Sequence, residues 1–191
     1  MTATALIDAE TIAHQVVREL APFAVRPAEP GEAAQARAFA ATLIGAGIAS
    51  ADDLARVQRR SGGASLFVTR EDGRLTGVMA FVLLNAAGHS AVRNGGFDTL
   101  APADAHIAGP REPAMAFYGW GVAAATKPSA RRLVDGGQAI MAGAIGHLPK
   151  FTRPTTEAGH RLVCERMGFV ALPGSRDGLV WRPALAPALA A

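Results

Sequence analysis

The feature that most restricts the fold of this sequence is a junction near residue 126, where a long apolar run meets a helical pattern. The run reads PAMAFYGWGVAAAT, is rich in aromatic and aliphatic residues, and is too short to span a membrane. It therefore predicts a buried strand over residues 114–126. The residues that follow, KPSARRL, open a helical pattern that runs from Ser129 to about Ala144, with Ser129 as its expected N-cap.

Three cations, Lys127, Arg131 and Arg132, lie where the predicted strand passes into the predicted helix. The first turn of a helix carries free backbone N–H groups and the positive end of the helix dipole, and both attract anions. Basic side chains oppose that dipole, so an anion is expected to compensate them. The pattern favours a bound phosphate and a nucleotide-type cofactor, for which coenzyme A is our first choice. The alternative is a solvated helix start.

The composition is that of a globular protein. The chain has 191 residues, of which 50% are hydrophobic and 18% are charged, which fits one substantial core and excludes a disordered chain. Residues 1–126 carry 10 Lys and Arg against 12 Asp and Glu, whereas residues 127–191 carry 9 against 4. The positive charge is thus concentrated around the proposed phosphate site. The basic residues are scattered without interleaved aromatics, which argues against nucleic acid as the partner.

Cysteine usage and the N-terminal sequence favour an intracellular protein. The single cysteine, Cys164, excludes an internal disulfide and a cysteine-based zinc cage, and the histidines show no metal spacing, so no metal is expected. Asp8 and Glu10 interrupt the N-terminus before a signal-peptide core can form, and no apolar stretch approaches the roughly 20 residues of a membrane helix. We expect a soluble, cytoplasmic protein.

Local patterns predict the other elements. An Asp72-Gly73 pair, which supplies the positive φ angles of a tight turn, separates two β-rich runs and predicts a hairpin. Residues 86–113 show no period and are predicted to be a long connection. Further helices are expected at 4–20, 31–47, 51–59 and 155–167, and further strands at 21–27, 145–151, 169–172 and 178–182.

This order of elements predicts an α/β fold, with a mixed sheet that carries helices on both faces. One domain is expected over residues 21–183. An extra amphipathic helix precedes it within residues 1–20, and an Ala/Pro-rich tail, expected to be disordered, follows over residues 184–191.

Four segments, in their order and spacing, resemble the GCN5-related N-acetyltransferase (GNAT) superfamily over roughly residues 22–182. FAVRPAEPGEAAQ resembles the first strand and helix of that fold, and EDGRLTGVMAF resembles its second and third strands. WGVAAAT with the helix after it resembles the acyl-CoA-binding segment, and TTEAGHRLVCERMGF is similar to the last helix. The resemblance implies a GNAT-like fold, acetyl-CoA or another acyl-CoA as cofactor, and acyl transfer to an amine.

The resemblance also assigns roles at the junction. In the family the fourth strand pairs with the pantetheine arm and the loop after it takes the pyrophosphate. On this chain the corresponding residues are Gly121, Val122, Ala123 and Ala124 for the arm, and Lys127, Ser129, Ala130, Arg131 and Arg132 for the pyrophosphate. The family's loop pattern, Gln/Arg-x-x-Gly-x-Gly/Ala, is altered here, because Ala130 and Arg132 replace its glycines. Side-chain cations are therefore expected to replace some amide contacts.

The family places the reacting centre between the fourth and fifth strands, here between residues 120–123 and 145–148. His147 falls on the predicted fifth strand, where a base would neutralise the attacking amine. The alternative is a histidine whose ring is satisfied by a backbone carbonyl.

Cys164 stands where the family commonly has a tyrosine that protonates the departing thiolate. Its thiol is a candidate general acid for that step. Two alternatives are a buried cysteine that acts as a small hydrophobe, and a nucleophile activated by His160 one helical turn earlier.

The leading hypothesis is an acyl-CoA-dependent N-acyltransferase, most simply an acetyltransferase, that acts by direct attack of a small-molecule or peptide amine. A backbone N–H near Val122 or Ala123 would meet the oxyanion. Tyr118 and Trp120 alternate along the strand and are either core residues or the lining of an acyl or acceptor pocket. The runner-up is a non-catalytic protein that binds CoA or an acyl-CoA, which the altered loop favours.

A third hypothesis, from another class, is a protein-interaction module. The stripe Ile12–Val16–Leu20 would then dock a partner or a second copy of the chain as a homodimer. The same stripe would otherwise cover the sheet of its own domain.

Overall fold

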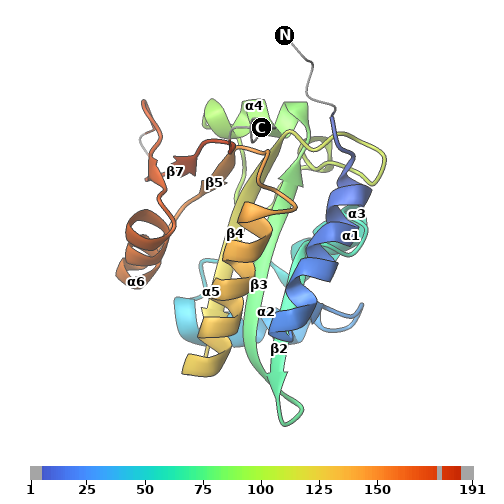
Figure 1. Ribbon diagram of the computed structural model, residues 1–191, viewed down its shortest axis with the longest axis vertical. Coiled ribbons are helices and arrows are strands. Elements are labelled where there is room, and N and C mark those ends of the chain that lie inside the picture. The colour runs from blue at the N-terminus through green and yellow to red at the C-terminus, as the bar shows by residue number, and fades with distance from the viewer. Residues whose placement is uncertain (1–5, 176–177, 186–191) are drawn as a thin grey trace, which may run out of the picture.

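A computed structural model of the chain describes residues 6–175 and 178–185. Its centre is a seven-stranded sheet in the order β1-β2-β3-β4-β5-β7-β6, in which β4 and β5 are parallel and the other neighbours antiparallel (Figure 1). The strands are β1 (Arg26–Pro27), β2 (Leu66–Glu71), β3 (Arg74–Leu84), β4 (Ala116–Ala124), β5 (Lys150–Thr152), β6 (Val170–Ala171) and β7 (Val180–Arg182). The helices are α1 (Ala9–Leu20), α2 (Ala33–Ile44), α3 (Ala51–Arg60), α4 (Ala86–Arg93), α5 (Lys127–Ala142) and α6 (Glu157–His160), with short 3-10 segments η1 (Ala21–Phe23) and η2 (Asp104–His106).

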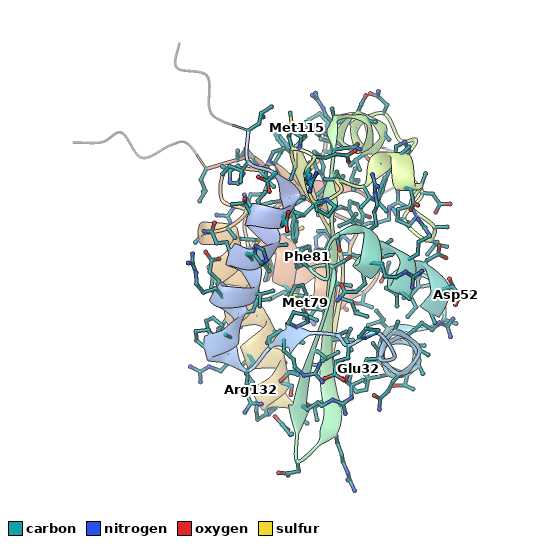
Figure 2. All side chains as sticks on the ribbon, turned by 90° about the vertical axis from the view of Figure 1, so that its right-hand side faces the viewer. Glu32, Asp52, Met79, Phe81, Met115 and Arg132 are labelled. Carbon is teal, nitrogen blue, oxygen red and sulfur yellow. The ribbon has the colours of Figure 1, made fainter. Side chains whose placement is uncertain are left out.

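Helices cover both faces of the sheet. Figure 2 shows α1 and α5 on one side of the strands and α2 and α3 on the other. Residues of β3 alternate between the two sides: Met79 and Phe81 pack with α1 and α5, whereas Val78 and Ala80 pack with α2 and α3. Because both faces are buried, β3 is almost entirely apolar. The predicted α/β class is therefore confirmed.

The N-terminal helix α1 belongs to this core. Its stripe residues Ile12, Val16 and Leu20 are each 0% exposed and pack in the same cluster as residues of β3 and α5. The helix begins after Asp8, whose carboxylate accepts the Thr11 backbone N–H at 2.8 Å. The stripe thus covers the sheet of its own chain and is not available for docking a partner.

Three predictions about the elements are wrong in informative ways. Residues 86–113 are not a structureless connection, because they contain α4 and η2. The fifth strand begins at Lys150 rather than residue 145, because residues 143–147 form a turn that follows α5. The predicted strand over residues 21–27 shrinks to Arg26–Pro27 because η1 takes up its first half.

The last helix changes character along its length. α6 begins after Thr156 and passes at Arg161 into a π-helix, η3, that ends at Arg166. It stands beside the β5–β7 end of the sheet (Figure 1). Of the predicted tail, residues 186–191 lie outside the described residues. No helix in the described part of the chain is long and apolar enough to cross a membrane.

Lys150, at the start of β5, carries a buried charge that makes the stability of the fold depend on pH. Its side chain is 0% exposed, and its ammonium donates to the carbonyl oxygens of Gly146 (2.9 Å) and Leu148 (2.7 Å). Burial, together with repulsion from Arg182, lowers the pKa of Lys150 to about 8 from its ordinary 10.5. The folded state therefore releases this proton at lower pH than the unfolded state does.

The free energy of unfolding is expected to rise by about 2–3 kcal/mol between pH 8 and pH 10, because each unit of pKa difference is worth about 1.4 kcal/mol. Below pH 8 both states hold the proton, and folding bears the full cost of burying the charge. Urea unfolding at pH 7.5 and 10 measures the difference. The Lys150→Met variant should lose this rise, and an unchanged rise in that variant would contradict the assignment.

Candidate active site

The candidate site lies where β4 and β5 separate. The two strands pair over Phe117–Lys150, Tyr118–Phe151 and Gly119–Thr152. Beyond this point β4 continues to Ala124, paired with β3 on one side only. Pro154 follows closely after β5 and has no N–H group, so the ladder cannot extend there. Within the described part of the chain, the second half of β4 therefore has one edge without a neighbouring strand, on the side on which β5 pairs with the first half.

A β-bulge lies at the same point. Phe81 of β3 pairs with Gly119 and Ala80 pairs with Gly121, so Trp120 is an extra residue on β4. A bulge bends its strand and increases the local twist, and it leaves the extra residue outside the regular ladder. The bulge therefore turns the second half of β4 away from the direction of β5 and helps to open the gap.

An apolar cavity of about 250 Å³ fills this gap. β4, α5, α6 and η3 form its walls, to which they contribute Gly121, Val122, Ala123, Leu133, Ile140 and Val163 among others. The cavity also reaches Ala36 and Ala40 of α2, on the opposite face of the sheet. Among the described residues that line it, Arg153 is the only charged one. A molecule on the α5 side and one on the α2 side would thus meet between β4 and β5.

Tyr118 and Trp120 line the cavity and also belong to the core. Tyr118 is 3% exposed, and its ring lies 5.1 Å from the ring of Phe97. Burial raises the pKa of Tyr118 to about 12, with a smaller opposing effect of Arg153, so its hydroxyl is protonated at neutral pH. The half-buried Trp120 donates its indole N–H to the carbonyl oxygen of Thr99 at 2.5 Å.

The first turn of α5 is capped from within the chain. Thr126, not Ser129, is the N-cap: its hydroxyl oxygen accepts the Ser129 N–H at 3.2 Å. The carbonyl of Thr126 accepts the Ala130 N–H at 2.9 Å, and Pro128 has no N–H. Within the described residues, the N–H groups of Thr126 and Lys127 have no hydrogen-bond partner, and the Lys127 side chain is exposed.

A carboxylate already faces this helix start. Glu71, at the end of β2, accepts hydrogen bonds from the hydroxyls of Thr126 (3.3 Å) and Ser129 (3.2 Å), and forms an ion pair with Arg132 at 3.4 Å. Ser129 is 0% exposed, and its hydroxyl oxygen lies 2.7 Å from that of Thr76. Two residues expected to contact pyrophosphate, Ser129 and Arg132, contact Glu71 in this structure.

The two expected catalytic residues, His147 and Cys164, are not among the residues that line the cavity. His147 lies in the turn before β5 rather than on the strand, near the edge of the sheet where β4 begins. Burial, with a contribution from Lys150, lowers the pKa of His147, and its Nε2 has no hydrogen-bond partner among the described residues. The expected centre between residues 120–123 and 145–148 is thus wrong in register, because residues 150–152 pair with β4.

Cys164 lies on η3, next to Val163, which lines the cavity. Its Sγ is 3.6 Å from Nε2 of His160, so the pair suggested by helical spacing is in contact. Burial, and then the nearby Glu165, raise the pKa of the thiol, which keeps it protonated at neutral pH. That state suits a proton donor better than a nucleophile.

Sequence reasoning missed two residues of this region. Glu71 precedes the Asp72-Gly73 turn, and in the sequence it looks like an ordinary exposed charge of a hairpin. Its partners Thr126, Ser129 and Arg132 are 55 to 61 positions away, so no local pattern indicates them. Arg153 directly follows β5 and reads as the end of a strand. Only the misplacement of the fifth strand kept Arg153 away from the predicted centre.

Comparisons with known proteins agree with the fold. No protein-family model matches this sequence, and no curated protein does. The structure matches a crystal structure from Corynebacterium glutamicum ATCC 13032, described as histone acetyltransferase HPA2 and related acetyltransferase, with a TM-score of 0.51 and 18% identity. The match covers 86% of this chain and 98% of that chain. At this identity the likeness concerns the fold, and this chain has the mixed α/β fold of that acetyltransferase.

Proposed function

We propose that this protein is an acyltransferase that moves an acyl group, most simply acetyl, from a pantetheine thioester such as acetyl-CoA to an amine. The observation that carries the proposal is the gap between β4 and β5, with its bulge at Trp120 and an apolar cavity open to both faces of the sheet. The fold shared with an acetyltransferase supports it.

The free edge of β4 is the proposed site of the pantetheine arm. A strand without a neighbour presents N–H and C=O groups in a regular row, and the amides of an extended arm can pair with them as another strand would. Gly121, Val122, Ala123 and Ala124 form this edge. The apolar residues Leu133 and Ile140 of α5 would lie against the arm and exclude water.

The thioester supplies an activated acyl carbon. The amine nitrogen forms a bond to it and gives up one proton to water, the C–S bond breaks, and the sulfur leaves as a thiol after gaining a proton. An N–H near Val122 or Ala123 would stabilise the oxyanion. Cys164 is the proposed proton donor to the sulfur, because its thiol is protonated at neutral pH and can regain its proton from water. Cys164 does not line the cavity itself, so its side chain would have to turn past Val163 to reach the sulfur. Tyr118, also protonated, would donate a hydrogen bond on the acceptor side.

The acceptor is expected to react as the free amine without a protein base. Among the described residues that line the cavity there is neither a carboxylate nor a histidine. The apparent pKa of kcat/KM should therefore follow the pKa of the acceptor, and should rise by about the same amount when a more basic amine replaces a less basic one. Rate profiles between pH 6 and 10 with two such amines test this. A single pKa near 6.5 for both would instead indicate a histidine base.

The test of the proposed function has two measurements. Calorimetric titration with acetyl-CoA and with acetyl-pantetheine measures donor binding. Thiol release, followed in the presence of a panel of primary amines, measures transfer. Binding of either donor and amine-dependent thiol release would support the proposal, whereas no binding of either would refute it. Binding without transfer would support the alternative, a ligand-binding protein, which the absence of a described base in the cavity lining favours.

A further inference from the structure

We infer that the thioester donor is selected by its pantetheine arm and acyl group alone, and that the diphosphate of CoA is not gripped by helix α5. The inference rests on the proposed function and defines its substrate class: thioesters that present an acyl-pantetheine arm, with or without a nucleotide. The inference follows from the partners that the backbone N–H groups and the charged side chains at the start of α5 already have within the chain.

Three of the five amide positions at the start of α5, residues 126–130, are already used or lack an N–H. Anion sites at helix starts work because several free N–H groups converge on the ligand. Here the Ser129 N–H is bound by the Thr126 hydroxyl, the Ala130 N–H is bound by the Thr126 carbonyl, and Pro128 has none. Two donors remain, the N–H groups of Thr126 and Lys127, which is fewer than the several that converge on an anion at such sites.

Two of the three cations at this helix start, Arg131 and Arg132, already have carboxylate partners. The Glu71 carboxylate lies against the positive end of α5, bound by the hydroxyls of Thr126 and Ser129 and by the Arg132 guanidinium. Arg131 forms an ion pair along its own helix with Asp135, at 3.4 Å. A diphosphate in this place would therefore meet a carboxylate rather than an empty positive site.

Glu71 is held there by the fold. The β2–β3 hairpin brings the end of β2 beside the start of α5, and the buried Ser129 hydroxyl joins Glu71 and Thr76 of the two strands. The carboxylate is 28% exposed in its ion pair with Arg132. It is thus a built-in counterion for the helix start, in the position where the sequence led us to expect a phosphate.

The arm, in contrast, keeps its site. The free edge of β4 and the apolar wall of α5 are intact at Gly121, Val122 and Leu133. These residues lie along the cavity, away from the capped first turn. A donor truncated after pantetheine would retain every contact that this chain offers to the arm and acyl group.

Donor truncation tests the inference. We expect acetyl-CoA and acetyl-pantetheine to bind, and to support amine-dependent thiol release, within about threefold of each other. S-acetyl-N-acetylcysteamine, which lacks most of the arm, should be at least tenfold weaker. Raising the salt from 50 to 300 mM should change the affinity for acetyl-CoA by less than threefold, because few charges are neutralised on binding. A preference of more than 30-fold for acetyl-CoA, lost in salt, would overturn the inference.

The Glu71→Gln variant gives a second, independent readout. An amide at this position still accepts hydrogen bonds from Thr126 and Ser129 but no longer neutralises Arg132. We expect the affinity for acetyl-CoA to rise at least threefold while that for acetyl-pantetheine stays within twofold. Glu112→Gln is the matched control, since Glu112 pairs with Arg60 instead.

The outcomes separate this inference from the proposed function. If Glu71→Gln leaves the affinity for acetyl-CoA unchanged or lowers it, Glu71 does not oppose the diphosphate and the inference is wrong. If wild type and Glu71→Gln bind neither acetyl-CoA nor acetyl-pantetheine, the proposed function itself fails.

Discussion

Gly121→Val is expected to abolish donor binding and acyl transfer, with at least a hundredfold loss of kcat/KM, while the protein stays folded. Gly121 lies on the free edge of β4 and lines the cavity, and a Cβ added there meets no atom within 4 Å. Its φ angle is not in the left-handed region, and valine suits a strand. Gly121 pairs with Ala80, so the new side chain would project toward α2 and narrow the gap beside the edge proposed for the pantetheine arm.

Titration calorimetry with acetyl-pantetheine and the thiol-release assay measure this loss, and thermal unfolding checks the fold. Gly31→Val is the matched control, because its added Cβ also meets nothing within 4 Å and Gly31 does not line the cavity. The control should keep full binding. If a folded Gly121→Val variant binds the donor as well as the wild type does, the proposed site of the pantetheine arm on β4 is wrong.

Gly88→Ala is expected to lower the free energy of unfolding by about 1–2 kcal/mol, the overpacking cost less the gain in helix propensity. A Cβ on Gly88 would lie 2.1 Å from the backbone carbonyl oxygen of His106, so α4 and η2 must move apart. Overpacking against the backbone commonly costs about 1–3 kcal/mol. Alanine's better helix propensity would return at most about 1 kcal/mol of it. Asn85 ties the same two segments together, since its amide donates to the Ala105 carbonyl at 3.0 Å.

Urea unfolding of the variant and the wild type gives the difference directly. Gly96→Ala is the control within the same segment, because its Cβ would lie 4.0 Å from the nearest atom and its φ angle is negative or extended. That variant should match the wild type within about 0.5 kcal/mol. Equal stabilities for Gly88→Ala and Gly96→Ala would show that α4 is free to move away from η2.

The helix α4 shows why residues 86–113 were misread. Its eight residues have few large apolar side chains, and only Gly88 and Val92 are buried, so no helical period is visible. The one local signal is its N-cap, Asn85, whose side chain accepts the Gly88 N–H at 3.0 Å. The close contact of Gly88 with His106, made only in the tertiary structure, fixes the helix in place.

The β5 strand was displaced for a related reason. Ile145, Leu148 and Phe151 are all buried, and their apolar character suggested a strand that began at residue 145. Three residues alone pair with β4, and the pairing includes the buried charge Lys150, which no apolar pattern would select. Long-range pairing between parallel strands sets such a register, and the local sequence does not encode it.

Strong local signals, in contrast, located their elements correctly. Asp72 and Gly73 have φ angles of 49° and 77°, as the predicted hairpin turn requires. Ser50 caps α3, and its hydroxyl oxygen accepts the Asp53 N–H at 3.0 Å. The strand β4 and the helix α5 follow one another directly at residue 126, so the junction that suggested the fold is present.

The sequence by itself determined the α/β class, the order of most elements and the strand-to-helix junction, because these depend on hydrophobic period, caps and turns within a few residues. The tertiary structure decided which charges meet at that junction. Lys127, Arg131 and Arg132 predicted an anion, and the anion that meets α5 is the carboxylate of Glu71, 61 positions before Arg132. Electrostatic partners depend on distance in space, and a pattern read along the chain carries no information about that distance until the strands are paired.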